Sequence, residues 1–398
     1  MDAPSASWSR PADGRPAALA ALVAAGVFLA TWWGLHHDFF LHAEISDLPL
    51  YRDYGNAMER GLVPYRDFAV EYPPAALPFF ALLGMASALR SLRAAPQRLG
   101  AALAFAALAP LALGAVVLTR FDLWPAALTV GALAAVLRGR NRLGLGVLGL
   151  GIAAKVYPAV LVPIFLVHVW RRRGAREALV CAGVCALVVA AVFVPFLVLA
   201  PHGVWASVVR QTTRPLQIES VGAAALIVAH HVGGLHLTLR SSFGSQNLVG
   251  AIPHDTGRVL TVLQVGTIAG VWAWFWRGDS GSRDRLVTAS AAAVCAFVAL
   301  GKVLSPQFLI WLVPLVPLVR GRRGLAASTL LAGALVLTQL WFPSRYWWLV
   351  YGFHTRETIL VASRDAILLV LLAVLLWPSR ALEPPDELQR GFRAHRDA

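Results

Sequence analysis

The chain has 398 residues and a net charge of +14; 58% of its residues are hydrophobic and only 14% are charged. Soluble domains carry about 25% charged residues, so this composition excludes an ordinary soluble protein. The basic residues gather in short clusters between apolar runs, which is typical of cytoplasmic loops in membrane proteins. The sequence therefore predicts a multi-pass protein of the lipid bilayer with no nucleic-acid partner.

The arginine clusters mark the side of the membrane on which each loop lies. We expect one integral-membrane domain over residues 16–378, with cytoplasmic tails at 1–15 and 379–398. The proposed cytoplasmic clusters are Arg90/Arg93/Arg98, Arg138/Arg140/Arg142, Arg171–Arg173 with Arg176, Arg277/Arg283/Arg285 and Arg320/Arg322/Arg323.

Apolar runs of about the length that a membrane-spanning helix needs follow one another along the chain. With the clusters inside, they predict an all-α bundle of about 12 transmembrane helices, two long outer loops at 36–72 and 200–256, and both termini inside. The segments 143–170 and 286–319 are too short for two full spans each, so we expect short out-and-back helix pairs. The remaining spans are predicted at 17–35, 73–89, 99–118, 123–137, 178–199, 257–276, 325–342 and 358–377.

The first outer loop combines six carboxylates with four tyrosines between Glu44 and Tyr72, and it ends in "VEYPP". Proline suits the first turn of the following helix, and Glu71 suits the positive end of the helix dipole. Carboxylates that accept hydrogen bonds from hydroxyls, beside rings that stack on sugar faces, indicate a sugar site. The alternative is a solvated loop beneath an interfacial aromatic belt.

Polar motifs also occur at other outer ends. "TRFD" places Arg120 and Asp122 before the span at 123–137, either as phosphate and hydroxyl ligands or as a simple ion pair. "SFGSQN" offers Gln246 and Asn247 for hydroxyl recognition, or forms a turn. "VWASVVRQTTRPLQIES" predicts an amphipathic helix lying on the membrane. Arg364 and Asp365 fall inside the last span, where charges are costly; they either pair with each other or line a cavity.

Lys155 and Lys302 are the only two lysines among 35 basic residues, and each is predicted at the outer turn of a short helix pair. Snorkelling towards the interface would explain a cation there, but arginine would serve equally well. A compact point charge in a tight space favours lysine. We expect at least one of the two to contact a phosphate, Lys302 before Lys155.

In aggregate, the motifs "SDLPLYRDYGNAMERGLVPYRDFAVEYPP", "TRFDLWPA", "GIAAKVYPAVLVP", "RPLQIES", "SFGSQNLVG" and "GKVLSPQFLIWLVPL" resemble glycosyltransferase family 87. The resemblance extends from about residue 20 to residue 375. It implies the C-type glycosyltransferase fold, a polyprenyl-phosphate sugar donor and a mannosyltransferase-like reaction at the cell membrane. It also implies a catalytic carboxylate soon after the first span, which is Asp47 here.

The resulting hypothesis is an inverting hexosyltransferase of the cell envelope with its active site on the outer face. It would move a hexose, mannose by resemblance, from the donor to a hydroxyl of a glycolipid or glycan acceptor. The alternative is a transporter or flippase of lipid-linked sugars, because the two short helix pairs look alike. No cofactor or metal is expected, and the three cysteines are expected to serve packing. The candidate substrate-binding residues are Glu71, Tyr72, Arg120, Asp122, Lys155, Tyr157, Gln246, Asn247, Lys302 and Gln307.

Overall fold

The structure is a computed structural model, and it describes residues 120–377 without a break. Before residue 120 it describes only short pieces: 22–27, 30, 53, 54, 57, 62, 65–68, 100–102, 104, 105 and 108. The predicted site residues Asp47, Glu71 and Tyr72 lie outside the described residues, as do both predicted tails.

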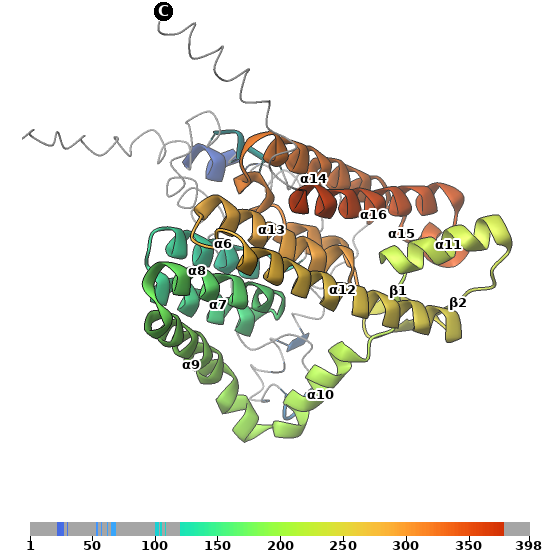
Figure 1. Ribbon diagram of the computed structural model, residues 1–398. Helices are drawn as coiled ribbons and strands as arrows, with labels where there is room; N and C mark the ends of the chain where they lie inside the picture. Colours follow the sequence, from blue (N-terminus) through green and yellow to red (C-terminus); the bar gives the residue numbers. More distant parts are fainter. Residues whose placement is uncertain are drawn as a thin grey trace, which may run out of the picture.

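Helices dominate the described part of the chain (Figure 1). The first half contains α6 (Leu123–Leu137), α7 (Asn141–Ala154), the 3₁₀ helix η2 (Tyr157–Leu161), α8 (Val162–Arg173), α9 (Ala175–Leu199), α10 (Pro201–Thr212) and α11 (Val221–Gly233). The second half contains α12 (Ala251–Arg277), α13 (Arg283–Ala299), the 3₁₀ helices η3 (Pro306–Trp311) and η4 (Val316–Leu318), α14 (Gly321–Trp341), α15 (Tyr346–Gly352) and α16 (Thr355–Leu376).

Four of these helices, α9, α12, α14 and α16, are long and apolar enough to cross a membrane. Their positions confirm the spans predicted at 178–199, 257–276, 325–342 and 358–377, and α6 coincides with the span predicted at 123–137. Shorter apolar helices precede α9 or lie between the long helices in the chain. The protein is therefore a helical membrane protein, and the total of about 12 crossings stays a prediction.

The first short helix pair forms as predicted, with α7 and α8 meeting at Lys155 and the one-turn helix η2. Glycines allow α7 to approach its neighbours closely. A Cβ on Gly144 would lie 2.5 Å from Val136 Cγ2, and one on Gly149 would lie 2.8 Å from the Cys185 carbonyl oxygen. Small residues at such contacts are typical of helix packing in membranes, so α7 is held tightly between α6 and α9.

The second short pair differs from the expected helical hairpin in its returning limb. After α13 the chain forms only η3 and η4, joined by turns, up to residue 318. Pro306, Pro314 and Pro317 explain this, because each lacks the N–H that a continuous helix requires. Most of this limb is nevertheless buried in the protein, which is where irregular backbone is tolerated within a membrane domain.

A small antiparallel sheet lies within residues 200–256, the segment for which the sequence predicts an outer loop and no strands. Its strands β1 (Leu216–Gln217), β2 (Thr238–Ser242) and β3 (Ser245–Val249) have the order β1-β3-β2. Phe243 and Gly244, which connect β2 to β3, both have positive φ, as a tight hairpin of the type I′ kind requires. "SFGSQN" therefore forms a turn, one of the two expected alternatives.

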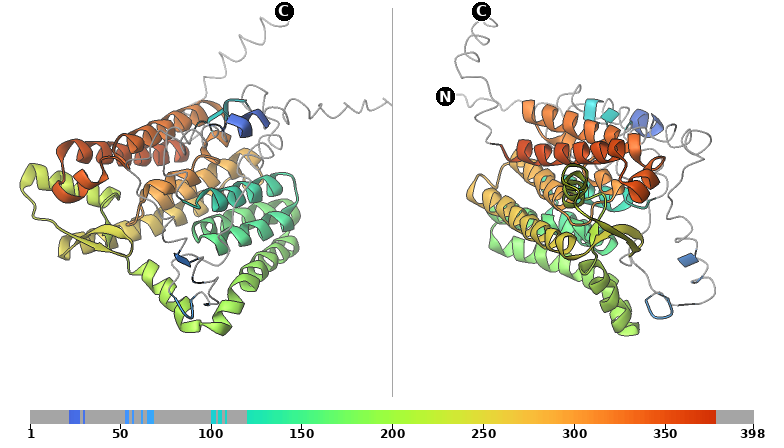
Figure 2. Two further views of the ribbon diagram at one scale, coloured as in Figure 1. Left: turned by 180° about the vertical axis from the view of Figure 1, so that it is seen from behind. Right: turned by 90° about the vertical axis from the view of Figure 1, so that its right-hand side faces the viewer.

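The sheet, α11 and α15 gather at one end of the bundle, the right-hand end in Figure 1. From there α10 leads down to α9, and the two helices form a V that is visible in Figure 1 and from behind in Figure 2. Tyr65 of the first loop packs edge-on against Phe196 near the end of α9, with ring centroids 5.2 Å apart. The first loop therefore meets the end of α9 that precedes α10.

Candidate functional site

Asp122 is the centre of a buried polar site. It lies just before α6, is 0% exposed, and its Oδ1 accepts hydrogen bonds from Lys155 Nζ at 2.6 Å and from Trp311 Nε1 at 2.7 Å. Lys155 comes from the turn of the first short helix pair and Trp311 from η3 in the second, so the two pairs meet at this carboxylate. The local sequence places Asp122 there because Pro125 falls in the first turn of the helix, where its missing N–H costs nothing.

Aromatic rings enclose the lysine of this pair. Lys155 Nζ lies 4.8 Å from the ring centroid of Phe121, 5.4 Å from Phe308 and 5.1 Å from Trp311. The Lys155 side chain is only 15% exposed. The ammonium is therefore held between one carboxylate and three aromatic rings, where cation–π attraction adds to the ion pair.

Trp311 is stacked between two other rings. Tyr157 lies 4.0 Å from it at an interplanar angle of 3°, and Phe308 lies 4.2 Å from it at 20°. The Tyr157 hydroxyl is 2.9 Å from Thr129 Oγ1. Stacking and hydrogen bonding together fix the plane of the indole, so its N–H is aimed at Asp122 before any ligand arrives.

The second oxygen of Asp122, Oδ2, is buried and accepts no hydrogen bond from any residue in the described part of the chain. Buried carboxylate oxygens almost always have a donor, and an ionised carboxylate accepts several. Within the described part of the chain, Oδ2 therefore keeps the capacity to accept a further hydrogen bond.

Further charges surround this centre. The side chains of Arg120 and Arg214 lie near enough to Lys155 and to Glu219 to interact with both of them electrostatically. Glu219 is 2% exposed and accepts a hydrogen bond from Gln217 Nε2. Arg214 Nη2 also donates to Ser245 Oγ at 3.0 Å. Three cations therefore converge near two carboxylates, where the β-hairpin meets the turns of the helix pairs.

The intramembrane charges of α16 reach the same region. Arg364 Nε lies 2.8 Å from Asp365 Oδ1, and its Nη2 donates to the backbone oxygen of Glu219 at 2.8 Å. Both residues are buried. Of the two alternatives that the sequence left open, the structure therefore shows pairing, and the pair anchors the segment that carries Glu219.

Four other predicted site residues form hydrogen bonds within the protein. Asn247 is buried and its side-chain nitrogen donates to the Ser242 carbonyl at 2.8 Å, which closes the hairpin. Gln246 Nε2 donates to Ser241 Oγ at 3.2 Å, and Gln307 Oε1 accepts from Ser305 Oγ at 3.2 Å. Lys302 Nζ donates to the Thr212 backbone oxygen at 2.8 Å. Their roles in substrate binding stay predictions.

Two participants in the site, Trp311 and Glu219, were not among the ten candidate substrate-binding residues. A signal for Trp311 exists, because a tryptophan between apolar residues in "PQFLIWLVPL" is expected to be buried and a buried indole N–H needs an acceptor. The amphipathic stretch "VWASVVRQTTRPLQIES" predicts a surface position for Glu219, whereas this residue follows β1 and is buried. No local pattern reveals that burial, because it depends on α16.

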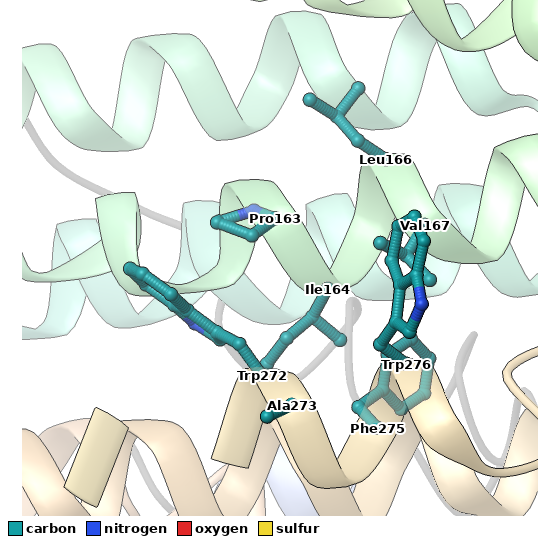
Figure 3. Close-up of a pocket in the computed structure, with 8 residues that line it drawn as sticks. All are labelled: Pro163, Ile164, Leu166, Val167, Trp272, Ala273, Phe275 and Trp276. Carbon is teal, nitrogen blue, oxygen red and sulfur yellow. The ribbon is translucent and has the colours of Figure 1, made fainter. Parts of the chain in front are cut away.

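A separate apolar groove of about 380 Å³ lies between α8 and α12 (Figure 3). Tryptophan and aliphatic side chains line it, and the indole of Trp272 is fixed by a 2.9 Å hydrogen bond to the Val160 backbone oxygen. Among the residues that the structure describes, no charged side chain lines this groove. It suits a hydrocarbon chain, whereas the chemistry of the polar site lies with Asp122.

The site is a buried carboxylate that accepts hydrogen bonds from a lysine and an indole, and it lies inside a bundle of apolar helices. Fold and site together define the class: a helical membrane protein with a preformed polar and aromatic site. Comparison with protein families is consistent with this class. The chain belongs to glycosyltransferase family 87, whose model matches residues 69–306, well over half of the chain. It is therefore a membrane glycosyltransferase, and the matched region includes Asp122, Lys155 and Lys302. No curated protein matches the chain.

The burial of Glu219 predicts that the stability of the protein depends on pH. Burial raises the pKa of its carboxyl to about 7, although Arg364, the bond from Gln217, Arg120 and Arg214 act in the opposite direction. The folded state thus holds a proton that the unfolded state releases above about pH 4.5. Between about pH 4.5 and 7 the wild type should lose about 3 kcal/mol of stability.

Glu219→Gln removes this titration, so the variant should gain stability relative to the wild type as the pH rises from 5 to 8. Thermal unfolding in detergent at both pH values measures the difference. An unchanged gap between variant and wild type across this range would show that Glu219 does not titrate there.

Proposed function

We propose that this glycosyltransferase moves a hexose, mannose by family resemblance, from a polyprenyl-phosphate donor to a hydroxyl of a glycolipid or glycan acceptor. The observation that carries the proposal is the position of Lys155, which lies beside Asp122 with Arg120 and Arg214 as the next cations. A sugar phosphate needs positive charge where its leaving group becomes an anion. The same centre offers aromatic faces and a carboxylate oxygen for a sugar.

The proposed reaction is a single displacement with inversion. The acceptor oxygen attacks the anomeric carbon, and the bond from that carbon to the phosphate oxygen breaks. The electron pair of the broken bond leaves with the prenyl phosphate, and a carboxylate takes the acceptor's proton. Asp47 is the proposed base. Lys155, with Arg120 and Arg214, would stabilise the departing phosphate, and no general acid is required.

The outer face is the proposed side of the reaction. Arg171–Arg173 end α8 immediately before α9, Arg176 lies in the first turn of α9, and Tyr65 packs near the other end of α9. A helix of 25 residues is about 37 Å long, enough to cross a bilayer core of about 30 Å. If the arginines are cytoplasmic, the first outer loop lies on the opposite side.

A fusion experiment checks this orientation. A reporter that is active only in the cytoplasm should work after Arg140 and fail near Gly61, and a reporter that is active only outside should give the opposite pattern. The reverse result would place the first loop in the cytoplasm, where nucleotide sugars are available, and would remove the proposed donor.

The direct test of the reaction uses purified protein, radiolabelled polyprenyl-phosphate mannose and a membrane lipid extract, followed by separation of the products. A labelled glycolipid that forms with this donor, and not with a nucleotide sugar, is the expected result. Transfer from the nucleotide sugar alone would overturn the proposal. Movement of the intact lipid-linked sugar across proteoliposomes, without a product, would favour the flippase alternative.

A further inference from the structure

A second polar cavity lies far from Asp122 along the bundle. It has a volume of about 100 Å³, room for several water molecules, and it lies where α6 ends, α7 begins, α8 ends and α13 begins. Its polar lining consists of Arg138, Asn141, His168, Arg172, Arg173 and Arg283. None of the lining residues is acidic.

Arginines converge on this cavity from three elements. A Cβ on Gly139 would lie 3.7 Å from Arg173 Nη2, so Arg173 extends over the turn between α6 and α7. Arg172 Nη1 donates to the Gly281 backbone oxygen at 3.3 Å, which holds it beside the turn before α13. His168 is 2% exposed, and its Nδ1 lies 2.7 Å from the Ser280 backbone oxygen.

The neighbouring carboxylates are engaged with other groups. Asp279 interacts electrostatically with His168 and accepts a hydrogen bond from the Gly281 N–H at 3.1 Å. On the same side, Glu177 pairs with Arg142 at 2.8 Å and Asp284 pairs with Arg320 at 3.0 Å. The cavity therefore has a surplus of positive charge, which an anion would stabilise.

The surroundings of Asn141 independently indicate a site for an anion. It is 7% exposed, lines the cavity, and its side-chain amide has no hydrogen bond with any residue in the described ranges. It is also the first residue of α7, a helix of 14 residues whose N-cap residue Arg140 supplies no side-chain cap. The first N–H groups of such a helix favour an anion.

From this geometry we infer that the cavity binds a phosphate group. Guanidinium groups match phosphate oxygens in pairs, and the Asn141 amide and the start of α7 add neutral donors. An anionic phospholipid of the leaflet on the arginine-rich side is the favoured source, because basic pockets between membrane helices bind such head groups. Helix α8 also lines the apolar groove of Figure 3 with its other face, and that groove can accept a chain of the same lipid.

The test uses the full-length protein in detergent and measures, by native mass spectrometry, how much phosphatidylglycerol or phosphatidylcholine it retains. Asn141→Asp keeps the side-chain shape and suits a helix start, but it places a negative charge in the cavity. Binding of phosphatidylglycerol should fall about tenfold or more in Asn141→Asp and in Arg172→Ala/Arg173→Ala. The first variant loses a neutral donor and repels the phosphate, and the second loses charge-assisted hydrogen bonds. Arg322→Ala, an exposed arginine of α14, is the matched control and should bind like the wild type.

A parallel arm with inorganic phosphate separates the two possible sources. At constant ionic strength, phosphate should protect the wild type from thermal unfolding but not Asn141→Asp; this result supports the cavity as a phosphate site. If phosphate protects but the protein shows no preference for phosphatidylglycerol, the site is assigned to a soluble phosphate. The inference is overturned if Asn141→Asp binds both probes like the wild type, or if Arg322→Ala weakens binding as much as the cavity variants do. Because the readout is binding at a site remote from Asp122, its failure leaves the proposed transfer reaction untouched.

Discussion

Asp47→Asn is expected to lower the rate of sugar transfer by about 10² or more, the usual scale for loss of a general base, while the protein still inserts into the membrane. Asparagine keeps the shape of the side chain but cannot take the acceptor's proton. The measurement is the initial rate of product formation with a saturating donor, at equal amounts of folded protein.

Asp67→Asn is the matched control from the same loop. Both carboxylate oxygens of Asp67 accept hydrogen bonds from Arg66, at 2.8 and 2.7 Å, in an exposed pair, and exposed pairs contribute little. Transfer should stay near the wild-type rate in this variant. Normal turnover in Asp47→Asn would instead move the base to Glu71, Asp53 or Asp122, in that order.

The positions of the membrane helices could be predicted from the sequence because lipid imposes strong constraints on composition. A helix that crosses the bilayer must be apolar for about 20 residues, and the arginine clusters interrupt the apolar runs at α8–α9 and α13–α14. The turn at Lys155 was also predictable, since two arginine clusters enclose a segment too short for two full crossings. These features depend on neighbouring residues, so one stretch of sequence is sufficient to reveal them.

The site could be predicted only in part, because its contacts join residues far apart in the chain. The "TRFD" motif indicated Asp122, but its bonds to Lys155 and Trp311 span 33 and 189 residues. The burial of Glu219 depends on Arg364, which is 145 residues away. The sheet was missed because its strands have only 2 and 5 residues, too few for an alternating pattern to stand out among apolar helices.

Lys155→Met is expected to impair both stability and donor binding. The variant leaves Asp122 buried without its cation, and breaking a buried pair in this way costs about 3–5 kcal/mol. It also removes the charge that we propose for the donor phosphate, so the KM for the donor should rise and inhibition by free polyprenyl phosphate should weaken. Thermal unfolding in detergent and inhibition kinetics measure the two effects separately. Lys302→Met serves as the comparison, because Lys302 bonds the Thr212 carbonyl and was the first lysine favoured from sequence.

A double variant separates a structural role of Lys155 from a functional one. In Lys155→Met/Asp122→Asn the buried charge of residue 122 is gone, and the asparagine oxygen still accepts the hydrogen bond from Trp311. Stability should therefore return towards the wild type, because a buried pair replaced as a whole is often neutral. Inhibition by polyprenyl phosphate should stay weak, since the change at position 122 does not restore the positive charge of Lys155. If inhibition recovers together with stability, Lys155 only neutralises Asp122, and the phosphate must be assigned to Arg120, Arg214 or Lys302.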